Sequence, residues 1–162
     1  MRSEMEKKEV MVVPNKILLD EVSRMLSEGT SVIIRTKGNS MLPFIRGGRD
    51  SVRLSCHSGI SVGDIVLARI NGDKYVLHRV FSVCGEEVTL MGDGNLKGKE
   101  NCSRAEVTGT VDGIIRPDGK EKVPGNGMVW RRLLPFRRIL LAIYKRTVLP
   151  VSDMLNDNDN EI

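Results

Sequence analysis

A serine in a tight loop and a histidine further along this 162-residue chain form the pair whose types and positions best suit nucleophilic catalysis. Ser40 lies between Gly38, which lets the backbone bend sharply, and residues 41–44, a Met-Leu-Pro-Phe run that can anchor the far side of the turn. A serine hydroxyl is a weak nucleophile, so it needs a base within hydrogen-bond reach that takes its proton during attack. His78 is the better candidate for this base, because His57 lies in a polar, turn-like run.

The stretch that carries His78 has the alternating pattern of a half-buried strand. Over residues 75–81, Val76, His78 and Val80 fall on one face, and the residues between them fall on the other. A hairpin turn at residues 71–73, Asn-Gly-Asp, joins this strand to the preceding one at 65–70. Lys74 is a competing base on the same face as His78, but it is four residues away, about 13 Å along an extended strand. Only one of the two can therefore occupy a site beside Ser40, and Lys74 reads as a solvated hairpin residue.

Four short motifs occur in a fixed order over about residues 31–111, half of the chain. They are Gly38-x-Ser40-Met41-x-Pro43, Gly63-Asp64-Ile65-Val66, His78-Arg79-Val80 and Gly92-Asp93-x-Asn95. Each tetrapeptide is weak by itself, but the ordered set resembles the signal peptidase family. The histidine immediately before arginine-valine is similar to the archaeal and endoplasmic-reticulum type, whereas the bacterial type has a lysine there. The resemblance extends more loosely to LexA-type self-cleaving repressors, which share the nucleophile turn and the fold but use lysine as the base.

The resemblance implies a serine endopeptidase that cleaves signal-type or leader-type peptides after small residues. Ser40 would be the nucleophile and His78 the general base and acid. An extended substrate would add as a strand beside the residues around Ser40, so Gly38, Asn39, Met41 and Pro43 are the predicted substrate-binding residues. The family implies no cofactor, and two histidines without close pairing give a metal site little support.

The third catalytic group stays open at the level of sequence. Asp93 could orient the imidazole as the acid of a triad does, but Gly-Asp-Gly-Asn is also a good turn sequence. The closer family type carries a second acidic residue five or six positions later, where this chain has Gly98 and Lys99, with Glu100 nearby. Either Asp93 or Glu100 completes a triad, or the site works as a dyad.

The oxyanion of the tetrahedral intermediate needs hydrogen-bond donors, and the backbone N–H of Ser40 is the natural one. Bacterial signal peptidases add a hydroxyl two residues before the nucleophile, a position that Gly38 occupies here. A second backbone amide or the Asn39 side chain would have to substitute for it. This departure also supports an alternative, a non-catalytic peptide-binding domain of the same fold. A self-cleaving LexA-type regulator is a further alternative, although about 30 residues before the core are too few for a helix-turn-helix domain and a linker.

Many short strands at regular spacing predict a mainly β fold, a coiled antiparallel β domain of the signal-peptidase/LexA-like type. We expect strands at 31–36, 51–55, 65–70, 75–81, 87–91 and 107–115. An amphipathic helix at 16–28 presents Ile17, Leu18, Val22, Met25 and Leu26 on one face. The expected divisions are 1–29, an N-terminal strand (10–13) and helix; 30–122, the peptidase-like β domain; 128–150, a basic amphipathic helix; and 151–162, an acidic, disordered tail.

Composition limits the function classes. The chain is 40% hydrophobic and 28% charged, as in an ordinary globular domain, and its 4% aromatic content argues against stacking platforms for single-stranded nucleic acid. The net charge of +4 belongs to the C-terminal segment, where seven basic residues and no acidic one occur from 122 to 152. Three widely spaced cysteines fit a reducing compartment.

The C-terminal segment interleaves Trp130 and many leucines and isoleucines with arginine and lysine. This pattern fits a helix in a membrane interface, and it fits a helix docked on the protein's own sheet about as well. Residues 1–10 lack the apolar run of a secretory signal, and no stretch approaches the length of a spanning helix. We therefore expect a cytoplasmic protein with peptide or preprotein substrates. Its helix 128–150 would contact the inner face of the membrane or a transporter, and nucleic-acid binding is not expected.

Overall fold

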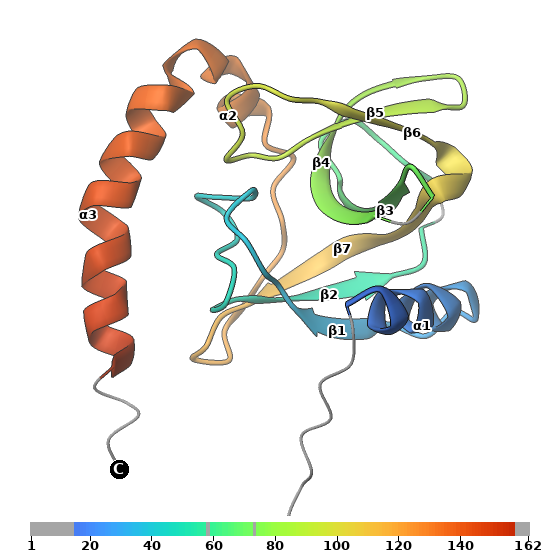
Figure 1. Ribbon diagram of the computed structural model, residues 1–162, viewed down its shortest axis with the longest axis horizontal. Coiled ribbons are helices and arrows are strands. Elements are labelled where there is room, and N and C mark those ends of the chain that lie inside the picture. Colours follow the sequence, from blue (N-terminus) through green and yellow to red (C-terminus); the bar gives the residue numbers. More distant parts are fainter. Residues whose placement is uncertain (1–14, 58, 73, 158–162) are drawn as a thin grey trace, which may run out of the picture.

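The computed structural model describes residues 15–57, 59–72 and 74–157. One antiparallel sheet forms the body of the molecule, with strand order β1-β2-β7-β3-β4-β5-β6 and β8 paired to β7. Its strands are β1 (Val32–Arg35), β2 (Ser51–Ser55), β3 (Ile65–Ile70), β4 (Lys74–Cys84), β5 (Glu87–Met91), β6 (Glu100–Ser103), β7 (Val107–Ile115) and β8 (Glu121–Lys122). The sheet curls round into an open half-barrel (Figure 1). The prediction of a mainly β, antiparallel, coiled architecture is confirmed.

The strands follow the predicted ones closely, because alternation and turn residues marked most of them. The hairpin between β3 and β4 pairs Ile70 with Lys74, and both Asn71 and Gly72 have positive φ, as a tight turn of this kind requires. The sequence analysis missed β6 and β8. Both are short and polar, and they lie in the sheet because they pair with β5 and β7.

Helix α1 (Asn15–Ser27) packs against β1, β4 and β7. Val22 and Leu26 are buried, and Leu19 packs against the same cluster. Ile17 and Leu18 are 60% and 48% exposed, so the apolar face lies differently from the predicted one at the start of the helix.

Two apolar clusters hold the sheet together, one on each side of β3. The first joins α1 to β1, β2, β7 and the Ser40 loop, through Met41 and Ile45 among others. The second fills the curl, and its members come mainly from β3, β4 and β5, with Cys102 of β6 and Val107 of β7. The alternation predicted for β4 is observed, since Val76 belongs to the second cluster whereas Leu77 packs against the first.

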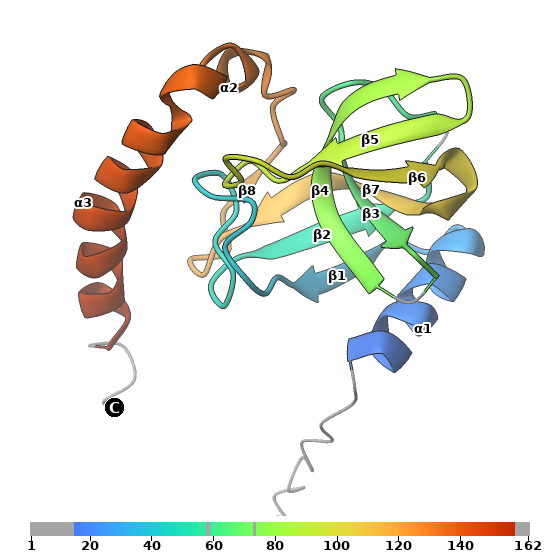
Figure 2. The same cartoon turned by 45° about the horizontal axis from the view of Figure 1, so that its top comes forward.

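The C-terminal segment is not one helix over 128–150. It forms α2 (Met128–Arg132), a 3-10 turn (Leu134–Phe136) and α3 (Arg137–Asp157). Pro135 lies in the 3-10 turn, where its missing N–H and its ring prevent a continuous helix. A third cluster, in which Leu42 packs with Trp130 and Leu141, fastens this segment to the Ser40 loop. Figure 2 shows α3 standing alongside the body of the molecule.

The helix continues to Asp157, into the tail that was expected to be disordered. The strand predicted at 10–13 and the last residues of the tail lie outside the described residues. Within the part of the chain that the structure describes, no helix is both long enough and apolar enough to cross a membrane.

Candidate active site

A backbone hydrogen bond joins the two ends of the loop that carries Ser40, and the two sides of the loop approach each other closely at Gly38 and Gly47. Thr36 N–H donates to Asp50 O at 3.0 Å, which joins the two ends of the loop. Gly38 has a φ of +73°, a left-handed conformation that favours glycine. Gly47 passes so close that a Cβ on it would overlap the Gly38 carbonyl. The backbone is therefore held in one path on either side of Ser40.

A buried carboxylate fixes the returning end of this loop. Asp50 is fully buried and accepts hydrogen bonds from Arg46 N–H at 2.8 Å, from Arg49 Nε at 2.9 Å and from Arg116. Arg116 also donates to Phe44 O at 3.1 Å. Sequence reasoning gave no role to Asp50 or Arg116, because their partners are up to 72 positions apart in the chain.

The turn after β5 supports Ser40 from the other side. Gly94 N–H donates to Ser40 O at 2.7 Å. A Cβ on Gly92 would lie 2.5 Å from Ser40 O, and one on Gly94 would lie 2.7 Å from Asn39 O. The two glycines of the Gly-Asp-Gly-Asn turn are thus explained by the close approach of two backbones.

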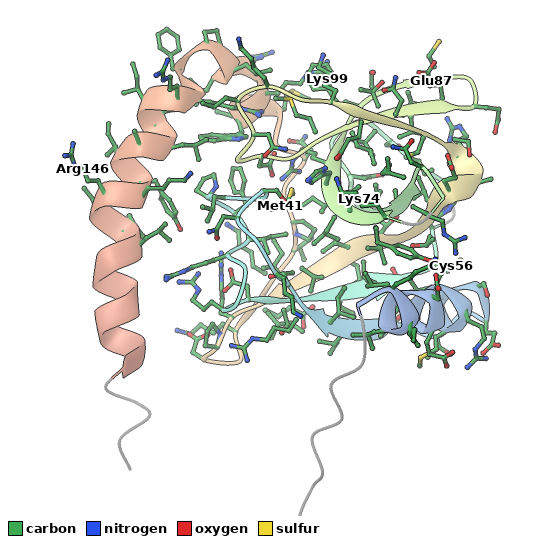
Figure 3. The ribbon with its side chains drawn as sticks, viewed as in Figure 1. Met41, Cys56, Lys74, Glu87, Lys99 and Arg146 are labelled. Atoms are coloured by element: carbon green, nitrogen blue, oxygen red, sulfur yellow. The ribbon has the colours of Figure 1, made fainter. Side chains whose placement is uncertain are left out.

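Ser40 and His78 line one groove of about 980 Å³. Its walls are α1, β1 with the residues that lead to Ser40, and the first half of β4, and Asn95 and Glu100 also line it. Figure 3 shows Met41 and Lys74, two further lining residues, near the middle of the molecule between the Ser40 loop and the curled sheet. The structure therefore brings the serine and histidine regions to one groove.

Within the described residues, no hydrogen bond occupies the hydroxyl or the N–H of Ser40. The structure thus places Ser40 and His78 on one groove without joining them directly. A free N–H next to the reacting hydroxyl is available as an oxyanion donor.

Glu100 is the acid that meets the imidazole. Its Oε2 lies 2.6 Å from His78 Nδ1, and His78 is buried with its side chain 7% exposed. Because a carboxylate only accepts hydrogen bonds, this contact keeps the proton on Nδ1 and leaves Nε2 of a neutral ring as the acceptor. Of the two acids that the sequence left open, Glu100 is the one that contacts the imidazole.

Asp93 has a different partner, which corrects its assignment as the residue that orients His78. It is 1% exposed, and its two carboxylate oxygens accept three hydrogen bonds from Arg79 at 2.7 to 3.1 Å. Arg79 also donates to Gly63 O at 2.7 Å, and Trp130 Nε1 donates to Asp93 O at 2.9 Å. Asp93 therefore fixes the turn beneath Ser40, the turn role that its sequence also suggested.

Lys74 contacts the same carboxylate as His78. Its Nζ lies 3.2 Å from Glu100 Oε1, and its side chain is 68% exposed. This exposed position agrees with the interpretation of Lys74 as a solvated hairpin residue.

The four predicted substrate-binding residues divide into two pairs. Gly38 and Met41 line the groove, whereas Asn39 and Pro43 are not among its described lining residues.

Sequence reasoning missed the contribution of β1. Ile33 and Arg35 line the groove, and in the described part of the chain β1 is an edge strand that pairs only with β2. The predicted strand that leads into Ser40 was the sequence feature that could have indicated this wall of the groove.

The remaining reactive side chains lie apart from this arrangement. His57 Nε2 contacts Val107 O at 3.1 Å, which fits the surface role expected for it. Burial, with Glu106 and Glu100 adding to it, raises the pKa of the Cys102 thiol to about 11. The described residues contain no group of three histidine, cysteine, aspartate or glutamate side chains placed to hold a metal ion.

Comparison of the chain with models of known protein families gives no match, and neither does comparison with curated proteins.

Proposed function

We propose that this protein is a serine endopeptidase of the signal-peptidase type that cleaves signal-type or leader-type peptides after small residues. The observation that carries the proposal is the hydrogen bond between His78 and Glu100 on the wall of the groove that Ser40 also lines. The ordered motifs and the curled antiparallel sheet agree with a fold of the signal-peptidase/LexA-like type.

In the proposed reaction, Ser40 Oγ attacks the scissile carbonyl and His78 Nε2 takes its proton. The imidazolium that forms is stabilised by Glu100 through Nδ1 and then protonates the leaving amine. The oxyanion accepts a hydrogen bond from Ser40 N–H. Water repeats the sequence on the acyl-enzyme, with His78 again acting as the base.

The substrate would bind as an added strand along β1. An edge strand offers unpaired backbone donors and acceptors, and β1 leads directly into the Ser40 loop. The preference for small residues at the cleavage site is what the resemblance to the signal peptidase family implies, and Met41, which is 3% exposed, lines the groove beside Ser40.

The experiment is a mass-spectrometric search for cuts in a diverse peptide library. We expect cuts with the wild type that are absent with Ser40→Ala and with His78→Ala. Lys74→Gln is the matched comparison, because it removes the exposed partner of Glu100 and leaves His78 in place. Cuts that persist in Ser40→Ala, or that disappear only with Lys74→Gln, would contradict the proposed roles. A library without cuts, with and without lipid, would favour the non-catalytic peptide-binding alternative.

We also propose that the C-terminal segment contacts a membrane surface. Phe136, Ile139 and Ile143 are 58%, 60% and 55% exposed, and Arg138 and Arg146 are exposed on the same segment. An exposed apolar surface with interleaved basic residues matches an anionic lipid interface. Replacing both Ile139 and Ile143 by glutamine should reduce flotation with anionic vesicles.

The matched control for this flotation experiment is Ile17→Gln on α1, because Ile17 is also 60% exposed. Equal flotation of the double variant and the wild type would remove the membrane contact from the proposal.

A further inference from the structure

A second cavity, of about 410 Å³, lies where the curled sheet meets the C-terminal segment. Residues from β4, β5, the turn at Asp93 and the segment from Asn126 to Arg137 line it. Figure 1 shows that the chain turns here from the sheet into α2 and then into α3. Neither Ser40 nor His78 lines this cavity, so it is separate from the groove described above.

The lining of this cavity is strongly basic. Among the described lining residues, Asp93 is the only acidic one. Four of the lining residues are arginines: Arg79, Arg131, Arg132 and Arg137. Asp93 is already committed, because it binds Arg79 through three hydrogen bonds. The other three guanidinium groups therefore face the cavity without a carboxylate of their own.

Arg137 is the most unusual of the four. It is 4% exposed, and its Nε donates to Trp130 O at 3.3 Å. Within the described residues, its two terminal amino groups have no hydrogen-bond acceptor, and no carboxylate lies within ion-pair distance. The guanidinium carbon lies 5.3 Å from the centroid of the Trp130 ring, and the terminal amino groups are not among the fully buried polar atoms of the described residues. The side chain is thus held in place by Trp130, with its terminal amino groups accessible to a ligand in the cavity.

The electrostatics around Arg137 point the same way. Burial and the nearby Arg79 lower its pKa, and Asp93 opposes this shift. An anion in the cavity would offset both unfavourable effects. Such an anion would add to the negative charge of Asp93, which already lines the cavity.

We infer that this cavity binds a phosphate group. A guanidinium presents paired N–H donors that match the oxygens of phosphate. Three guanidinium groups carry three positive charges, more than the single negative charge of a carboxylate ligand would balance. Val62, Val80 and Met128 add apolar walls to the same cavity. The phosphate is therefore carried by an organic group, as in a soluble phosphate ester or a phospholipid headgroup.

Binding of inorganic phosphate and of glycerol 3-phosphate, measured by calorimetry, tests the inference without reference to peptide cleavage. We expect saturable binding to the wild type that is weakened roughly tenfold or more by Arg137→Gln, because a charge-assisted contact is lost. Arg132→Gln should weaken binding as well, and this exposed residue can be replaced without unfolding the protein. Circular dichroism of each variant checks the fold.

Arg138→Gln is the matched control, since Arg138 is the next residue of α3, is exposed and does not line the cavity. It should bind phosphate like the wild type. Equal losses in Arg132→Gln and Arg138→Gln would reveal diffuse attraction to a basic helix and overturn the site. So would the absence of saturable binding to the wild type.

Vesicles distinguish the two sources of the phosphate. Sedimentation with phosphatidylcholine vesicles, with and without phosphatidic acid, is compared for the wild type, Arg132→Gln, Arg137→Gln and Arg138→Gln. A loss of phosphatidic-acid-dependent binding in the two cavity variants alone identifies a lipid headgroup. Unchanged vesicle binding, together with lost calorimetric binding, identifies a soluble phosphate ester. A change in neither measurement contradicts the inference.

Discussion

His78 Nδ1 lies 2.6 Å from Glu100 Oε2, a contact that joins the middle of β4 to the first residue of β6 across the curl of the sheet. It fixes the orientation and the tautomer of the imidazole. The two residues are 22 positions apart, and β5 lies between their strands in the sheet.

Replacement of Glu100 by glutamine is expected to lower kcat for peptide cleavage by roughly 10²- to 10⁴-fold, because the amide no longer enforces the tautomer or stabilises the imidazolium. The measurement is the rate of cleavage of a peptide found in the library. Glu87→Gln is the control, since Glu87 is exposed at the far end of the curl (Figure 3). A wild-type rate in Glu100→Gln would show that the contact has no part in catalysis.

Replacement of Gly92 by alanine tests the support of the nucleophile loop. The new Cβ would lie 2.5 Å from Ser40 O and 2.8 Å from Asn95 Nδ2, so one of these groups must move. We expect a loss of about 1–3 kcal/mol in the free energy of unfolding and a larger proportional loss of activity. Gly59→Ala is the control, because nothing lies within 4 Å of its Cβ position. Denaturant unfolding of both variants gives the comparison, and equal stabilities would refute the close packing.

Replacement of Asp50 by asparagine tests the buried carboxylate under the same loop. Its arginine partners keep their charges and lose the carboxylate, and we expect a destabilisation of about 3 kcal/mol. Asp112→Asn removes a carboxylate that is 43% exposed and lies 3.7 Å from Arg53, so it should change the stability little. The check is the midpoint of urea unfolding for each variant. A similar midpoint for the two would mean that Asp50 is not a structural anchor.

The three cysteines should differ in their reaction with iodoacetamide. Cys56 and Cys84 are exposed, whereas Cys102 is buried with its pKa raised to about 11. The folded protein therefore holds the Cys102 proton more tightly than the unfolded chain does. This contribution to stability is complete below the unfolded pKa and is lost as the pH rises from about 9 to 11.

At pH 8 we expect two labelled cysteines in the native protein and three after denaturation, counted by intact mass. Because the Glu100 charge contributes to the raised pKa, Glu100→Gln should lower it and speed the labelling of Cys102 at high pH. Three labels on the native protein at pH 8 would contradict the assigned burial.

The sequence predicted most of the sheet for identifiable physical reasons. Alternation at residues 75–80 located β4, and Asn71-Gly72 located its hairpin. Short polar strands such as β6 carry no such pattern, since only their pairing with a neighbour makes them strands. The sequence analysis treated 128–150 as one helix, whereas the break at Pro135 takes a form that depends on packing around Trp130.

The candidate site was predictable in part. Ser40 and His78 follow from residue type and motif order, and the groove that they share is consistent with that reading. The choice between Asp93 and Glu100 could not be made from spacing, because it depends on the curl of the sheet, which brings Glu100 of β6 to His78 of β4 although β5 lies between the two strands. Asp93 was assigned to the site because of its motif. Its carboxylate instead binds Arg79, the residue that follows His78 in the sequence.

The central claim is that His78 acts as a base on the side chain at position 40, and Ser40→Cys tests it without a peptide substrate. In a Cys56→Ser, Cys84→Ser background, the introduced thiol is the accessible one, because Cys102 is buried. An imidazole within reach takes the thiol proton and leaves a reactive thiolate. The account predicts alkylation by iodoacetamide near neutral pH that is roughly tenfold or more faster with His78 than with His78→Gln. Equal rates in the two proteins would contradict it.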